Sequence, residues 1–121
     1  MNYESELVVE SKAEPGVAYR LARVSFGRRM ELTRRVRELW RKVEFLNAGT
    51  DPGEKIEAAV LSAEIDRLYV LWALRGVTGL TIDGQAATPE SLTEAGPEVL
   101  FREALGAVKA ECGLEEAETK N

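Results

Sequence analysis

Histidine is absent from this sequence, and cysteine occurs once, as Cys112. A single cysteine cannot form an internal disulfide, and without histidine a zinc site with the usual ligands is excluded. Long apolar runs are absent too, because stretches such as Leu68 to Leu74 are far shorter than the roughly 20 residues that span a bilayer. We therefore expect no metal site, no cofactor and no membrane span. Since no basic-then-apolar signal segment opens the chain, we expect a cytoplasmic protein.

The composition is that of a folded globular protein. Apolar residues make up 45% of the 121 residues and charged residues 31%, which is too apolar a mixture for a disordered chain. A chain of this length can bury most of the surface that its unfolded form exposes. We expect one globular domain over residues 1–113, followed by a flexible acidic tail over 114–121.

Two short hairpins are predicted by alternation and turn residues. Apolar residues at 7–9 precede a turn at 14–16, and Val17, Tyr19 and Leu21 then alternate with less apolar neighbours, as in a half-buried strand. The pair Asp83-Gly84 favours a type I′ turn between short strands near Leu80 and Gln85. We expect these strands and the N-terminal hairpin to form one small antiparallel sheet.

Helices account for most of the remaining chain. From about Arg28 to Ala48, apolar residues follow a four-three-four-three spacing that places them on one side of a helix: Leu32, Val36, Leu39, Val43 and Leu46. A cap at 51–54 starts a second helix that runs to about Leu74 or Arg75, and the short loop predicts an antiparallel pair. A brief helix at 88–92 and a C-terminal helix follow. The predicted fold class is α+β, predominantly helical.

A basic face is the first candidate site. The segment 20–42 carries nine of the sixteen basic residues against two acidic ones, a charge of +7 in a chain whose net charge is −5. At about 100° per residue, Arg34, Arg37 and Arg41 lie together opposite the apolar stripe, with Phe45 near them. These four residues are a candidate partner-binding face for an acidic protein segment or a phosphate backbone. The alternative is a solvated helix face.

The end of the second helix is the second candidate. It is apolar nearly all round, and Tyr69, Val70, Leu71 and Leu74 form a candidate self-association surface. The alternative is that this segment is the central core helix, covered by the strands that flank it in sequence.

No catalytic constellation stands out. Glu64 and Asp66 lie two apart on a helix and do not face each other, and Cys112 lies on an apolar face without a histidine to activate it. The glycines are spaced for turns and match neither a P-loop nor a dinucleotide fingerprint. We expect no catalytic residue and no enzymatic activity.

The order of the parts resembles a known family. A short β opening leads to a basic helix over 28–42 and then to an alanine- and acid-rich helix. This is followed by Gly-Leu-Thr-Ile-Asp-Gly at 79–84, Ala-Thr-Pro-Glu-Ser-Leu at 87–92, a Gly-Pro pair at 96–97, and an acidic end with Lys120 and Asn121. This layout resembles small proteins of bacteriophage and prophage tail-assembly modules, of the tail assembly chaperone type, although it identifies no functional residue.

The resemblance implies a non-enzymatic assembly chaperone or adaptor in the cytoplasm of a bacterial host cell. Such a protein would bind the tape-measure protein or tail-tube subunits and act as a homo-oligomer. Two alternatives stay open, a nucleic-acid-binding regulator that uses the arginine-rich helix and a self-assembling structural protein. The negative net charge and the lack of a zinc-finger, RNP-type or helix-turn-helix signature argue against nucleic acid.

Overall fold

The computed structural model describes residues 1–113, so the predicted acidic tail at 114–121 lies outside the described residues. The chain forms two compact units. Among the described residues, 1–24 and 70–113 make up one, here called the sheet unit, and Ser25–Tyr69 make up the other, the helical unit. Each is described by itself, and the expectation of one domain over 1–113 stays a prediction. The predicted fold class, α+β and predominantly helical, is confirmed.

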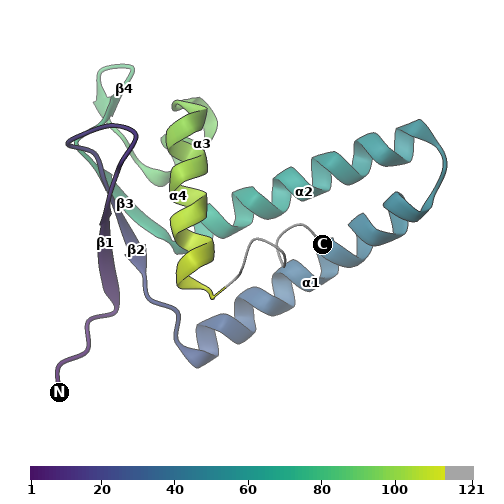
Figure 1. Cartoon of the computed structure of the whole chain (residues 1–121), viewed down its shortest axis with the longest axis horizontal. Helices are drawn as coiled ribbons and strands as arrows, with labels where there is room; N and C mark the ends of the chain where they lie inside the picture. The colour runs from purple at the N-terminus through teal and green to yellow at the C-terminus, as the bar shows by residue number, and fades with distance from the viewer. Residues whose placement is uncertain (114–121) are drawn as a thin grey trace. The chain divides into compact units, whose positions relative to one another are not determined.

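The sheet unit contains a three-stranded antiparallel sheet in the order β1-β2-β3 (Figure 1). Its strands are β1 (Glu6–Glu10), β2 (Ala18–Ala22) and β3 (Leu74–Thr78). In the central strand β2, Tyr19 and Leu21 are fully buried and Arg20 between them is exposed, which is the period-two pattern of a strand with one buried face. The predicted N-terminal hairpin is therefore confirmed.

Strand β3 corrects the predicted end of the second helix. Leu74 does not end a helix but begins a strand, and it pairs with Leu21 of β2. A Cβ atom on Gly76 would lie 2.9 Å from the guanidinium of Arg20, whose Nη2 donates a hydrogen bond to the carbonyl of Arg75 at 3.3 Å. Gly76 thus leaves room for the Arg20 guanidinium beside β3.

The central hairpin was assigned to the wrong sheet. Strands β4 (Thr81–Ile82) and β5 (Gln85–Ala86) form a separate two-stranded sheet and do not join the N-terminal hairpin. The predicted turn itself is confirmed, because Asp83 and Gly84 have φ angles of 52° and 80°, both positive as a type I′ turn requires. Strand β2 already pairs with β1 and β3, so it offers no free edge to this hairpin. With two residues in each strand, β4 and β5 pair only with each other among residues 1–113.

Two helices complete the sheet unit. The short helix α3 (Pro89–Ala95) begins with a capping box, in which the side chains of Thr88 and Ser91 each accept from the other's backbone N–H. The C-terminal helix α4 (Glu98–Glu111) buries one face, formed by Leu100, Ala104, Leu105 and Val108. Cys112, just after it, is buried as well.

The helical unit is an antiparallel pair. Helix α1 (Phe26–Ala48) and helix α2 (Pro52–Ala73) run in opposite directions from a short loop (Figure 1), and the last four residues of α2 belong to the sheet unit. Ser25 caps α1 by accepting a hydrogen bond from the backbone N–H of Arg28. Of the predicted stripe, Leu32, Val36 and Val43 are buried, while Leu39 and Leu46 are half-buried.

Candidate interaction surface

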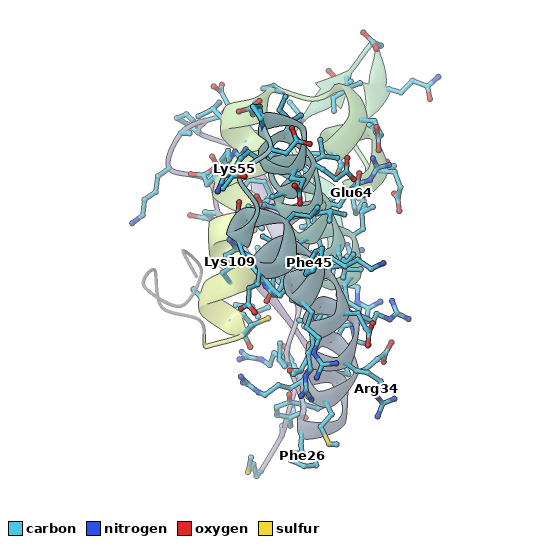
Figure 2. All side chains as sticks on the ribbon, turned by 90° about the vertical axis from the view of Figure 1, so that its right-hand side faces the viewer. Phe26, Arg34, Phe45, Lys55, Glu64 and Lys109 are labelled. Carbon is cyan, nitrogen blue, oxygen red and sulfur yellow. The ribbon has the colours of Figure 1, made fainter. Side chains whose placement is uncertain are left out.

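The predicted basic face lies on the exposed side of α1. Arg34, Arg37 and Arg41 are all exposed, and Phe45 keeps 75% of its surface in contact with solvent. Their spacing of three, four and four residues aligns them along the helix, opposite the buried stripe. Figure 2 shows Arg34 and Phe45 on this helix. The predicted placement is confirmed, whereas binding of a partner stays a prediction.

Among the described residues, the arginines of this face have no partner. On the same helix, Arg35 pairs with Glu31, with 3.0 Å between Nη2 and Oε1. Within residues 1–113, by contrast, the side chains of Arg34, Arg37 and Arg41 form no ion pair and no hydrogen bond. Three guanidinium groups are therefore free to form charge-assisted, bidentate contacts with carboxylates of another molecule.

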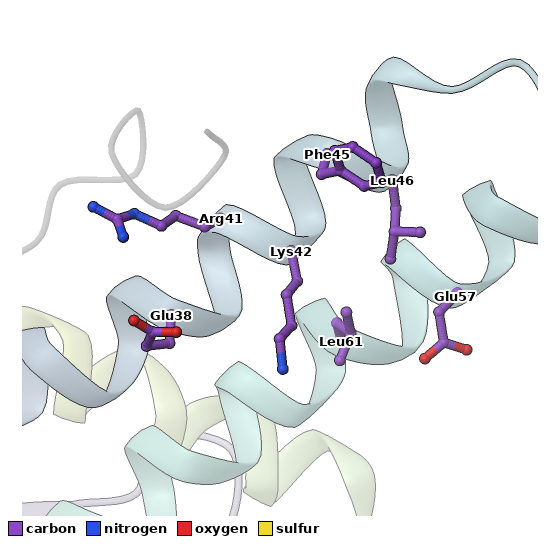
Figure 3. Close-up of a pocket in the computed structure, with 7 residues that line it drawn as sticks. All are labelled: Glu38, Arg41, Lys42, Phe45, Leu46, Glu57 and Leu61. Carbon is purple, nitrogen blue, oxygen red and sulfur yellow. The ribbon is translucent and has the colours of Figure 1, made fainter.

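A groove adjoins the C-terminal end of the basic face. It has a volume of about 470 Å³ and lies between α1 and α2, lined by Glu38, Arg41, Lys42, Phe45, Leu46, Glu57 and Leu61. Lys42 and Leu46 point from α1 toward α2, whereas Arg41 points away from it (Figure 3). The two leucines give the groove an apolar floor, and its rim carries two acidic and two basic side chains. An apolar side chain of another molecule could be seated there.

The predicted self-association surface is wrong for three of its four residues. Tyr69, Val70 and Leu74 expose 8%, 0% and 3% of their surface, and only Leu71, at 36%, is exposed. The cause lies in the chain's path, because α2 leads directly into β3 and this junction takes part in the core. These residues are apolar on all sides because they form a core segment, which is the alternative to a self-association surface that the sequence left open.

A carboxylate network that the sequence did not predict lies in the sheet unit. Glu103 of α4 accepts hydrogen bonds from the backbone N–H groups of Lys12 and Ala13, at 2.9 and 3.1 Å, and from the hydroxyl groups of Ser11 and Tyr19. The donors all come from β2 or the β1–β2 turn, about ninety residues away in sequence. No local sequence signal links Glu103 to that turn, so only the tertiary fold could reveal the contact.

This network holds Glu103 in its ionised form. The Ser11 hydroxyl, and after it Tyr19 and the two amides, lower the pKa of Glu103 from 4.5 to about 2, outweighing the opposite effect of burial. Burial and the neighbouring Glu103 raise the pKa of the Tyr19 hydroxyl above its usual range. At neutral pH Glu103 therefore accepts all four hydrogen bonds as a carboxylate, and three of these bonds connect the β1–β2 turn to α4.

Comparison with known proteins gives no relative. No family model, no curated protein and no solved structure matches this chain. The interpretation of the surface therefore depends on its geometry and charge. Among residues 1–113, no helix is both long and apolar enough to cross a membrane. The same residues contain no cluster of three or more His, Cys, Asp or Glu side chains placed to hold a metal ion.

Proposed function

We propose that this protein is a non-enzymatic assembly chaperone or adaptor that binds an acidic helical segment of another protein. The observation that carries the proposal is the row of three arginines on α1 that lack partners in residues 1–113, next to the exposed Phe45. Arginines suit this role because a guanidinium pairs with a carboxylate through two parallel hydrogen bonds. Phe45 adds an aromatic anchor at one end, the residue type that often dominates binding energy at interfaces.

The spacing of the face favours a helical partner. Arg34, Arg37, Arg41 and Phe45 follow one line along α1, so a second helix laid beside α1 can present acidic residues three or four apart to successive arginines. The partner's apolar anchor would enter the groove beside Phe45. Electrostatic attraction of this kind speeds association and selects acidic partners, and it weakens as salt concentration rises.

The resemblance to tail assembly chaperones suggests which partner to test first. Under this proposal the acidic segment belongs to a phage-type tail protein, either the tape-measure protein or a tail-tube subunit. A nucleic-acid-binding regulator is the second candidate, because the same unpaired arginines could contact phosphates. The net charge of −5 opposes it.

The test is co-purification with tail proteins encoded in the same genome, using nuclease-treated lysate. The triple variant Arg34→Gln, Arg37→Gln and Arg41→Gln is compared with a matched triple in the sheet unit, Lys12→Gln, Arg23→Gln and Arg75→Gln. Both triples take the net charge from −5 to −8, so total charge cannot explain a difference between them. We expect the α1 triple alone to lose the partner.

Two other results would count against the proposal. Equal loss of the tail protein with both triples would show a general charge effect without a defined face. Binding of duplex DNA at low salt that falls steeply as salt rises, with no tail protein retained, would instead support the nucleic-acid candidate.

A further inference from the structure

The groove between α1 and α2, where the proposed function seats a partner's apolar side chain, also has the features of a site for a second copy of the chain. Phe45 lies beside Leu46 and Leu61, which form the apolar part of the groove. The same surface therefore carries an exposed aromatic side chain and an apolar groove that can bind one. A surface that presents both is complementary to a copy of itself. This groove is therefore an apolar surface of the helical unit that is open to a second chain.

The charges on the rim match those of a second copy. Glu38, Lys42 and Glu57 form no ion pair or hydrogen bond within residues 1–113, and neither does Arg41. Two acids and two bases give the rim a net charge of zero, which selects neither an acidic nor a basic ligand. A second copy supplies the same two acids and two bases, so each charge can find an opposite one.

The distribution of charge between the helices selects one arrangement. Helix α1 contains seven basic and three acidic residues, a net +4, whereas α2 contains four acidic and two basic residues, a net −2. Packing α1 on α1 of another copy would bring like charges together. A two-fold axis parallel to the groove instead places α1 of each copy on α2 of the other, with basic residues against acidic ones.

We propose that this groove is a dimer interface, in which a second copy of the chain docks with α1 on α2. Phe45 of each copy fills the groove of the other, and Lys42 of each copy faces Glu57 of the other. Lys42 and Glu57 lie at nearly the same distance from the loop along their helices, since 42 and 57 are about equally far from residue 50. The dimer covers Phe45 and the groove, so it competes there with the partner's apolar anchor, while Arg34 and Arg37 stay accessible. The dimer does not depend on the identity of any partner.

Sedimentation over a range of protein concentrations tests the apolar contact. We expect the full chain to dimerise and Phe45→Ala to weaken dimerisation roughly 100-fold, because the change removes an aromatic anchor from both sides of the interface. Phe26→Ala is the matched control, since Phe26 is on the same helix and 81% exposed but does not line the groove. The control should dimerise like the wild type. A monomer at all concentrations, or a dimer unaffected by Phe45→Ala, would overturn the proposal.

Charge exchange tests the arrangement. Lys42→Glu and Glu57→Lys should each weaken dimerisation at least about 10-fold, because each sets like charges against each other twice. Mixing the two variants should restore the dimer, since both pairs are then of opposite charge. Circular dichroism of each variant checks that the helices remain formed. Failure of the mixture to dimerise while both variants stay folded would show that Lys42 and Glu57 do not meet across two chains, and the arrangement would be wrong.

Discussion

Replacing Glu103 with glutamine tests how firmly α4 holds the β1–β2 turn. The substitution keeps the size of the side chain but removes the charge that four donors share. The two backbone N–H groups both donate to one carboxylate oxygen, Oε2, and the two hydroxyl groups both donate to the other, Oε1. A glutamine that keeps its oxygen on the backbone amides turns its NH2 group toward the two hydroxyls, which can then no longer donate to it, so two hydrogen bonds to a charged acceptor are lost along with the charge.

The pKa of Glu103 sets the size of the effect. A carboxyl whose pKa falls from 4.5 to about 2 on folding corresponds to an upper limit of about 3 kcal/mol of stability. Because Glu103 is only half-buried, solvent screening reduces this, and we expect a loss of roughly 2 kcal/mol at pH 7. The folded-state pKa is the lower one, so the contribution is complete above pH 4.5 and is lost as the pH falls toward 2. The difference between wild type and Glu103→Gln should therefore shrink over that window.

Urea denaturation of the Trp40→Phe background measures the loss, because the one tryptophan left is then Trp72, which lies in the sheet unit. Hydrogen exchange at the amides of Lys12 and Ala13 gives a local reading, and both should exchange faster in Glu103→Gln. Glu98→Gln is the control, since Glu98 is on the same helix in an exposed pair with Arg102 and should cost less than about 0.5 kcal/mol. Equal costs for the two variants, or a cost for Glu103→Gln that is the same at pH 7 and pH 3, would refute this account of the network.

Four further substitutions test two turns, a helix cap and a helix. Gly79→Ala should lower stability by more than about 2 kcal/mol, because Gly79 has a φ of +78° and a Cβ there would lie 1.9 Å from the carbonyl oxygen of Gly16. Gly84→Ala should lower it by only about 1 kcal/mol, because Gly84 has a similar φ of +80° but open space around the Cβ position. Similar urea midpoints for the two variants would argue against the close contact at Gly79. Thr88→Ala should lower stability by about 1 kcal/mol in thermal denaturation through loss of the cap, and an unchanged midpoint would contradict that role. Gly106→Ala, within α4 and with nothing near its Cβ, should raise the melting temperature by an amount equivalent to about 0.5–1 kcal/mol, and a decrease would mean that the helix does not accept alanine there.

Local chemistry was enough to predict much of the fold. The period of Leu32, Val36 and Val43 predicted a helix with the right buried side, and Asp83-Gly84 predicted a type I′ turn that the φ angles confirm. Both features depend on residues that are close together in sequence. The exposure of the arginine face followed from the same helical period.

The features that were missed depend on contacts between distant residues. Leu74 continues the apolar run of α2, and only its pairing with Leu21 makes it a strand residue. The burial of Val70 likewise depends on the fold, since an apolar helix end is equally compatible with a core or with an interface. Glu103 appears in sequence as an ordinary acidic residue of a surface helix, and the Ser11 and Tyr19 side chains that bind it come from the other end of the chain.

Binding at the arginine face is the central claim, and an NMR titration tests it most directly. The side-chain Nε–H signals of the labelled full chain are followed as the acidic helical segment of the captured tail protein is added. The account predicts that the signals of Arg34, Arg37 and Arg41 shift together at low salt, while that of Arg35, which is already paired with Glu31, shifts least. Binding of the segment with these three signals unchanged would contradict the claim and place the partner site elsewhere on the protein.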